Sequence, residues 1–308
     1  SSDLGQNGDF MKQQIKSSLI LLLTATIWGV AFVAQSVGME YIGPFTFNAI
    51  RCVLGGLVLI PVILVLKKKK ETGAENQEKE DKKTLWAGGI ACGVILCIAS
   101  NLQQFGIMEA SVGKSGFFTA LYIVMIPVIG IFIGKRPGIK LWFCVALAVV
   151  GMYLLCMKDG SFTIERADIM LLLCALAFSF HILVVDYFSP KVDGVKMSCI
   201  QFFVCGVLSA VGMLFTETPD ISNIQAAWLP LLYAGLLSCG VGYTLQIVGQ
   251  KGINPVIASL IMSLESVISA LAGWVILGQV LSPKEILGCV LMFVAIIITQ
   301  IPIGNKKT

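Results

Sequence analysis

Ten apolar stretches of about 18 to 23 residues follow one another between Ser17 and Ile301. An α-helix needs about 20 apolar residues to cross about 30 Å of hydrocarbon. Hydrophobic residues make up 56% of the chain and charged residues only 13%, whereas soluble domains carry about 25% charge. The pattern therefore predicts an all-α integral membrane protein with ten transmembrane helices.

The expected spans are separated by short turns that mostly contain Gly or Pro, with one exception. The connection 67–83 is wholly polar and highly charged, which predicts a disordered cytoplasmic loop. We interpret residues 1–10 as an expression scar and exclude them from the fold. The expected spans are 17–36, 45–66, 84–106, 115–134, 139–157, 167–187, 196–215, 228–249, 255–277 and 284–301.

The distribution of positive charge predicts the orientation of the chain in the membrane. With the amino terminus inside, seventeen of the 22 lysines and arginines lie in cytoplasmic segments. Only Lys114, Lys158, Arg166 and Lys284 then lie in outer loops. Because cytoplasmic loops carry the excess of Lys and Arg, we expect a multi-pass protein of the cytoplasmic (inner) membrane with both termini in the cytoplasm.

The second half of the chain repeats the first at offsets between 143 and 150 residues. Each half holds five expected spans, and because five is odd the second copy enters the membrane from the opposite side. An inverted repeat of this kind is typical of secondary transporters, which bind substrate near the midplane between their halves. We therefore expect two five-helix repeats, 11–157 and 158–308. The matching ranges are 21–32 with 171–182, 42–56 with 192–206, 103–106 with 246–249, and 134–151 with 278–295.

Several motifs in these spans resemble those of one transporter family. They are Trp28-Gly29, Phe32, Arg51, Asn101 to Gln104, Gly113 to Phe117, Tyr122, Pro127, Gly242 to Gln246, Gln250-Lys251 and Ala258 to Ser266. In these residues the chain resembles the EamA-type members of the drug/metabolite transporter superfamily, over almost all of 17–301. The resemblance implies ten helices in two inverted repeats, a central cavity and alternating access. One departure is Gly278-Gln279, where the family usually has Gly-Glu.

Glu265 is the sharpest functional candidate, because it lies 11 residues into a 23-residue span. A carboxylate near the middle of a bilayer is costly unless it is paired, hydrated or protonated. Glu265 either faces a cavity, where it binds a cationic group or carries a coupling proton, or it is a hydrogen-bonded structural residue between helices.

Arg51 and His181 are the other ionisable candidates within the spans. Arg51 can pair with an acid, bind a substrate carboxylate bidentately, or extend outward along its stem; we favour a structural or charge-pairing role. His181, the only histidine, is either a satisfied core residue or a second candidate for substrate binding and proton coupling.

A set of amide and aromatic side chains completes the predicted substrate site. Buried amides either join helices or line a wet cavity, and Gln103 and Gln246 occupy equivalent places in the two halves. The aromatic side chains are expected to form cavity walls. The full predicted set is Trp28, Phe32, Asn101, Gln103, Gln104, Tyr122, His181, Tyr243, Gln246 and Glu265.

These features favour a secondary transporter that exports a small metabolite by alternating access, and we expect an amino acid or related compound as its substrate. A multidrug or other metabolite carrier is the alternative, and a channel or an intramembrane enzyme is a remote one. No Walker motif is present, and one histidine is too few for a metalloenzyme. We expect no enzyme activity, no cofactor, no metal and no nucleic-acid partner, and either a monomer or a homodimer.

Overall fold

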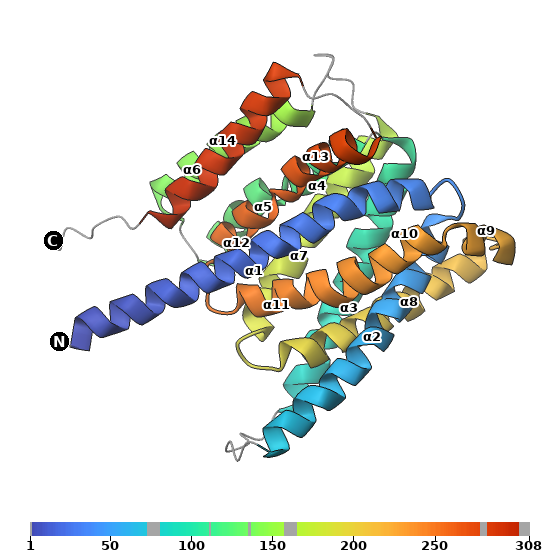
Figure 1. Cartoon of the computed structure of the whole chain (residues 1–308), viewed down its shortest axis with the longest axis horizontal. Coiled ribbons are helices and arrows are strands. Elements are labelled where there is room, and N and C mark those ends of the chain that lie inside the picture. The colour runs from blue at the N-terminus through green and yellow to red at the C-terminus, as the bar shows by residue number, and fades with distance from the viewer. Residues whose placement is uncertain are drawn as a thin grey trace.

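The computed structural model describes residues 2–72, 81–110, 112–134, 137–156, 165–277 and 282–301. All regular structure within these residues is helical, as Figure 1 shows. The start of α1 (Ser2–Gly38) and the end of α14 (Pro283–Gln300) lie on the same side of the molecule (Figure 1).

Each expected apolar span coincides with helix. The first half contains α1, α2 (Pro44–Thr72), α3 (Lys82–Glu109), α4 (Val112–Ala120), α5 (Tyr122–Phe132) and α6 (Ile139–Cys156). The second half contains α7 (Arg166–Phe188), α8 (Gly194–Thr216), α9 (Ile221–Ala226), α10 (Trp228–Leu232), the π-helical η1 (Tyr233–Tyr243), α11 (Thr244–Gln250), α12 (Pro255–Met262), α13 (Glu265–Leu277) and α14.

Eight helical segments of the described chain are long and apolar enough to cross a membrane, and Ile139–Leu154 is a shorter apolar helix. The predicted ends need correction. Helix α1 begins at Ser2 rather than at residue 17, and α2 continues to Thr72, so part of the predicted loop 67–83 is helical. Lysine and glutamate are good helix formers, which allows a helix to continue beyond its apolar stretch. Residues 73–80 and Gly278-Gln279 lie outside the described residues.

Two of the expected spans are each divided into two helices. The fourth breaks at Leu121, between α4 and α5, and the ninth breaks between α12 and α13. At the second break the Ser263 hydroxyl donates to the Leu260 carbonyl at 2.7 Å, and the Leu264 amide donates to the Ile261 carbonyl at 3.2 Å. Such side-chain and three-residue hydrogen bonds compete with the α-helical ladder. Leu121 and Leu264 are separated by 143 residues, the offset that also relates Gln103 to Gln246.

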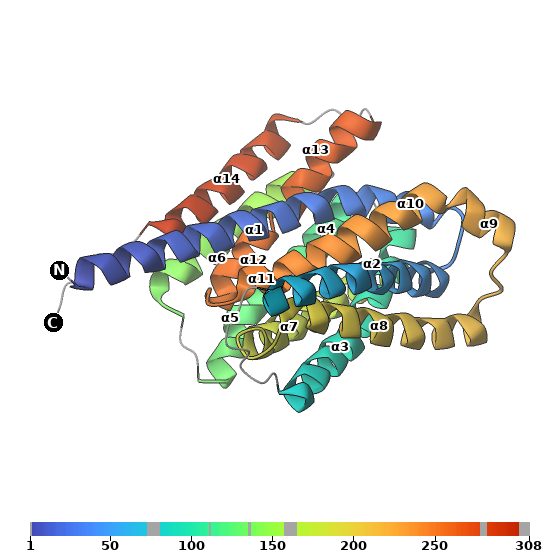
Figure 2. The ribbon, with the colours of Figure 1, turned by 60° about the horizontal axis from the view of Figure 1, so that its bottom comes forward.

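Corresponding helices of the two halves pack side by side in opposite directions. The carboxylate of Glu217, which follows the end of α8, accepts hydrogen bonds from the Phe45 and Thr46 amides at the start of α2, both at 2.9 Å. At the other pair, Lys284 at the start of α14 lies over the Tyr153 ring near the end of α6, at 5.7 Å. The α6–α14 pair is visible in Figure 1, and Figure 2 shows α2 beside α8.

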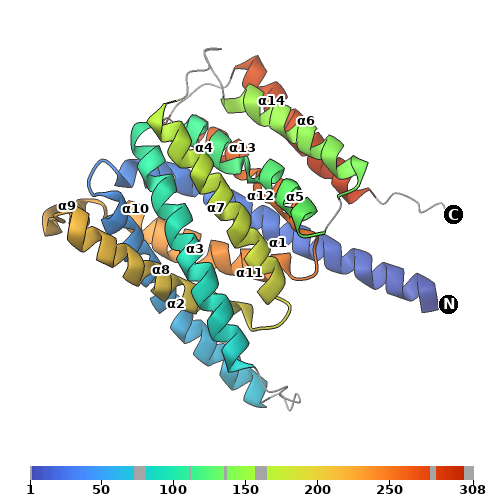
Figure 3. The same cartoon turned by 180° about the vertical axis from the view of Figure 1, so that it is seen from behind.

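The turns between the first two helices of each half also correspond. Helix α1 ends at Gly38 and α2 begins at Pro44, whereas α7 ends at Phe188 and α8 begins at Gly194. Each second-half boundary lies 150 residues after its counterpart. These two turns therefore recur with the same length in the two halves of the chain. Figure 3 shows the face on which α3 and α7 pack against each other.

Candidate substrate site

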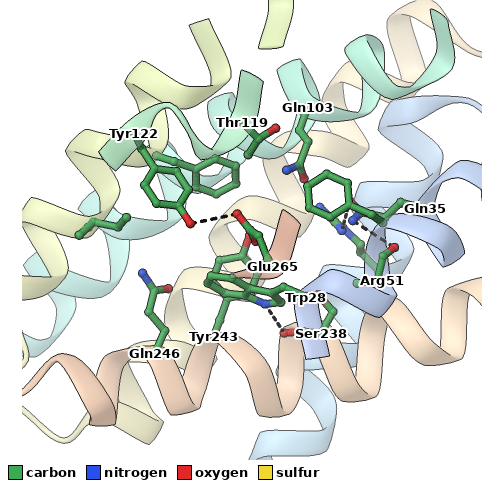
Figure 4. A pocket seen from close by; sticks show the side chains of 14 residues that line it. Trp28, Gln35, Arg51, Gln103, Thr119, Tyr122, Ser238, Tyr243, Gln246 and Glu265 are labelled. Atoms are coloured by element: carbon green, nitrogen blue, oxygen red, sulfur yellow. Dashed lines mark hydrogen bonds between the residues drawn. The ribbon is translucent and has the colours of Figure 1, made fainter. Parts of the chain in front are cut away.

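The central pocket lies where helices from both halves meet. The space not filled by atoms measures about 430 Å³ when the opening is counted. Most of this space is too narrow for a water molecule, and the remainder holds about two. Figure 4 shows its polar side chains converging from several helices. The lining residues are Trp28, Ala31, Phe32, Gln35, Arg51, Gln103, Thr119, Tyr122, Phe178, Ile182, Ser238, Tyr243, Gln246 and Glu265.

Glu265 and Tyr122 form a hydrogen bond at this pocket. The Tyr122 hydroxyl donates to Oε1 of Glu265 at 3.0 Å (Figure 4). Each is the first residue of the helix that follows a break, since α5 begins at Tyr122 and α13 at Glu265. Glu265 is 4% exposed, and no cation of the described chain pairs with it. The break therefore brings a buried carboxyl group to the pocket wall, with a phenol as its hydrogen-bond donor.

Arg51 brings a positive charge to the same pocket from α2. Its Nη1 donates to Oε1 of Gln35 on α1 at 2.8 Å, and its guanidinium lies 5.7 Å from the centre of the Phe47 ring. Arg51 is 2% exposed, so it does not extend outward to water. Among the described residues, no carboxylate pairs with it and its Nε has no hydrogen-bond partner. The predicted pairing with an acid of the chain is therefore not found in the described residues.

Aromatic side chains form much of the remaining wall. The Trp28 and Tyr243 rings are 4.6 Å apart between centroids and tilted by 54°. The Trp28 indole Nε1 donates to the Ser238 carbonyl at 3.4 Å. These contacts hold the Trp28 ring at the pocket, so the wall includes apolar surface as well as charged groups.

The lining includes four pairs of residues at equivalent positions in the two halves. Trp28 corresponds to Phe178 and Phe32 to Ile182, each at an offset of 150. Gln103 corresponds to Gln246 and Tyr122 to Glu265, each at an offset of 143. All eight line the same pocket. The pocket therefore lies between the halves and receives matching contributions from both.

Three predicted binding residues do not line this pocket. Asn101 donates to the Ser209 hydroxyl and accepts from the Asn48 amide, both at 2.9 Å, between α3, α8 and α2. His181 contacts Oε1 of Gln201 through Nε2 at 3.0 Å, and its ring packs edge-on against Tyr243. Gln104 is fully buried elsewhere, and neither atom of its amide has a partner among the described residues.

The pocket also contains residues that the sequence analysis did not include. Gln35 lies seven residues after Trp28 and four after Ala31, a spacing that places all three on one face of α1. Phe178 and Ile182 could have been found as the repeat counterparts of Trp28 and Phe32. Thr119, three residues before Tyr122, follows the same helical spacing. Helical spacing and the equivalence of the two halves would therefore have identified most of these additional lining residues from the sequence.

The long apolar helices define the class of the molecule as a multi-pass membrane protein, with a pocket lined by helices from both halves of the chain. The family model described as the EamA-like transporter family matches residues 15–157 and 165–301. The chain therefore belongs to the EamA-like transporter family and transports a small molecule across a lipid bilayer. Its family and relatives are named as transporters rather than as enzymes.

Relatives and a solved structure agree with this assignment. The chain is 27% identical over 301 residues to an uncharacterized transporter of Archaeoglobus fulgidus, covering 95% of this chain and 91% of that protein. It is 24% identical to the uncharacterized transporter YwfM of Bacillus subtilis, covering 94% and 96%. A crystal structure of a protein with 17% identity superposes with a TM-score of 0.74, over 92% of this chain and 96% of that chain. This last similarity concerns the fold alone.

Proposed function

We propose that the protein is a secondary transporter that exports a small metabolite, with an amino acid or related compound as substrate, by alternating access. The observation that carries the proposal is the pocket between the halves, with Tyr122 and Glu265 at equivalent positions joined by a hydrogen bond. Secondary transporters built from repeats bind substrate near the midplane at the repeat interface, where broken helices meet. The lining residues are the proposed substrate site.

We infer that the chain forms ten transmembrane helices as two inverted five-helix repeats, 11–157 and 158–308. The antiparallel packing of α2 with α8 supports this inference, as do the equivalent breaks at Leu121 and Leu264. The family model also matches the chain in two ranges of similar extent. In such an arrangement one half can move against the other around the site between them.

The narrowness of the pocket supports a mechanism that requires movement. Space for about two water molecules does not accommodate an amino acid, so substrate binding requires the halves to separate on one side. A ligand shifts the balance between two conformations by the difference between its affinities for them. Release on the opposite side follows when the other conformation opens.

Glu265 is the proposed site of proton coupling. The Glu265 carboxyl group is buried at the pocket wall without a cationic partner among the described residues, so it can exchange a proton for a cationic group of the substrate. The titratable and charged groups that line the pocket with it are Tyr122, Tyr243 and Arg51, while α1 and α4 contribute Trp28, Phe32, Gln35 and Thr119. Entry of a proton at Glu265 would then drive export of substrate. His181 lies behind Tyr243 and is the weaker candidate for this role.

The proposed setting is the cytoplasmic membrane with both termini inside, supported by the distribution of Lys and Arg. The pocket is complete within one chain, so a monomer can act, although a homodimer fits equally well. A multidrug or other metabolite carrier is the alternative, and it is favoured by the aromatic part of the wall, Trp28, Phe32, Phe178 and Tyr243.

Counterflow in proteoliposomes tests the proposal. Vesicles loaded with a pool of unlabelled amino acids are diluted into labelled tracer at equal pH on both sides. A carrier is expected to accumulate the tracer transiently, because the excess of unlabelled substrate inside competes with the tracer for exit from the vesicle. A pH gradient is then applied to ask whether net movement becomes concentrative.

Each outcome has a defined meaning. Counterflow with one amino acid would establish a carrier and its substrate. Counterflow only with drugs, nucleosides or sugars would reject the amino acid and favour the alternative carrier. A continuous current without saturation would contradict alternating access and favour a channel.

A further inference from the structure

We propose that the pocket recognises a zwitterion by two separate contacts, with Arg51 binding a carboxylate and Glu265 binding an ammonium group, and that its ligand is an α-amino acid with an apolar side chain. This inference rests on the proposed function and assigns chemistry to the same site. The pocket supplies one charge of each sign and leaves each without a charged partner from the described chain.

The first contact is the guanidinium of Arg51. A fully buried charge is unfavourable unless it is paired and hydrogen-bonded, yet Arg51 has only the neutral amide of Gln35 and the Phe47 ring as close partners. Its Nε, which could complete a bidentate contact, is buried without a partner among the described residues. Arginine presents its donors in a planar fork that matches a carboxylate. Because Arg51 lies on the pocket wall and has no carboxylate partner among the described residues, we infer that a ligand supplies the carboxylate.

The second contact is the carboxyl group of Glu265. Tyr122 occupies Oε1 with one hydrogen bond, which leaves Oε2 and the second lone pair of Oε1 for a ligand. An ammonium group carries three donors and no acceptor, so it satisfies these positions and neutralises the charge. Arg51 and Glu265 form no ion pair with each other and line the same pocket, so both remain available to the two charges of a zwitterion.

The apolar part of the pocket wall indicates the side chain of the ligand. Trp28, Phe32, Phe178, Ile182 and Tyr243 line the same pocket as Arg51 and Glu265. Of the lining side chains only Arg51 and Glu265 carry a formal charge, so a third charge on the ligand would be buried without a partner. The combination excludes basic and acidic amino acids and favours leucine, isoleucine, valine, methionine or phenylalanine.

The wild-type protein tests the inference with matched analogues. For leucine, 3-methylbutylamine lacks the carboxylate and 4-methylpentanoate lacks the ammonium group. Binding is measured as competition against labelled leucine in counterflow at pH 7. Both analogues are expected to bind at least about tenfold more weakly than leucine, because each leaves one buried charge of the pocket unpaired. An amine or a carboxylate that binds as well as leucine would overturn the inference.

A substitution at Gln35 should weaken the preference for leucine over 3-methylbutylamine without removing the charge of Arg51 or Glu265. Gln35→Glu gives Arg51 a carboxylate from the chain, which competes with that of the ligand. The ratio of 3-methylbutylamine binding to leucine binding is expected to rise at least about tenfold. Gln35→Met removes the hydrogen bond to Arg51 without adding a charge, so it is the matched comparison and should raise that ratio less than Gln35→Glu does. Glu265→Gln is expected to raise the ratio of 4-methylpentanoate to leucine instead.

The outcomes separate this inference from the proposed function. Counterflow with a compound that is not an amino acid, together with no leucine competition, would reject the zwitterion and keep the transporter. Absence of counterflow with any compound would reject the proposed function itself. Equal loss of leucine and both analogues in Gln35→Glu, in protein that still elutes as a folded species, would overturn the role of Arg51.

Discussion

Two buried polar regions of this molecule contain similar side chains but differ in how those side chains are satisfied. In the asparagine cluster, formed by Asn48, Asn101 and Ser209, the Asn101 side chain joins α2, α3 and α8 through hydrogen bonds of 2.9 Å. It also donates to the Cys97 carbonyl at 2.8 Å. Only the Asn48 carbonyl oxygen of this cluster has no partner among the described residues.

The central pocket shows the opposite balance. Arg51 Nε and Gln246 Oε1 are buried there without partners among the described residues, and the Glu265 carboxyl group has one donor. Buried polar groups in native proteins are nearly always satisfied, so groups left open at a pocket indicate a ligand. A binding site is therefore distinguished from a helix–helix contact by unpartnered polar groups that also line a pocket, rather than by the type or depth of a buried residue.

The largest expected effect is at Glu265. In Glu265→Gln, accumulation driven by a pH gradient should fall at least about tenfold, because the amide can neither take up nor release a proton. Counterflow at equal pH and saturating substrate should persist, with a higher half-saturating concentration because the ammonium loses its charged partner. Glu265→Asp retains an acid and should retain part of the accumulation. Unchanged pH-driven accumulation in Glu265→Gln would remove Glu265 from proton coupling.

A pair of amide substitutions tests the comparison itself. Asn101→Leu leaves the Asn48 amide and the Ser209 hydroxyl without their partner, so it should lower the free energy of unfolding by about 2 kcal/mol or more. Gln246→Leu should leave stability unchanged and weaken substrate binding about tenfold. Thermal unfolding in detergent and the half-saturating concentration in counterflow measure the two effects. Weaker binding in Asn101→Leu together with lower stability in Gln246→Leu would contradict the distinction between the asparagine cluster and the pocket.

A smaller effect is expected where α1 crosses α13 at the pocket. A Cβ atom at Gly29 would lie 2.5 Å from Cβ of Ile268 and 2.8 Å from the Glu265 carbonyl oxygen. Gly29→Ala should therefore push the helices apart and destabilise the protein by about 1 kcal/mol or more. Gly116→Ala is the control, because the nearest atom to its Cβ is at 3.5 Å. Equal melting temperatures for the two variants would contradict the close contact.

The smallest expected effect is the loss of the Tyr122 hydroxyl. Tyr122→Phe removes one hydrogen bond to the Glu265 carboxyl group, with a contribution of about 1 kcal/mol. The rate of pH-driven accumulation should fall about three- to tenfold. Tyr153→Phe on α6 is the control and should have no effect on that rate. A Tyr122→Phe variant with wild-type rates would show that the bond serves packing rather than coupling.

Much of the fold could be predicted because a bilayer forces long apolar helices at regular spacing. The breaks could not be read from hydropathy, since both fall at leucines, Leu121 and Leu264, within predominantly apolar spans. The extension of α2 through Thr72 was also missed, because lysine-rich residues outside a membrane are compatible with either helix or loop.

The candidate site was predicted in part. The repeat offset identified Gln103 and Gln246, and the motif residues Trp28, Phe32, Tyr122, Tyr243 and Glu265 also line the pocket. Gln104, adjacent to Gln103, points elsewhere because successive residues of a helix are rotated by about 100°. A span that is apolar on every side gives no hydrophobic face from which to choose between them.

The most direct test of the central claim is the access of water to the pocket from each side of the membrane. Gln246→Cys is labelled with a membrane-impermeant thiol reagent in right-side-out and in inside-out vesicles, with the wild-type protein as the blank for native cysteines. Alternating access at this pocket predicts labelling from both sides, with each rate lowered by substrate in proportion to its occupancy of the site. Labelling from neither side, while counterflow continues, would place the transport path elsewhere and contradict a substrate site at this pocket.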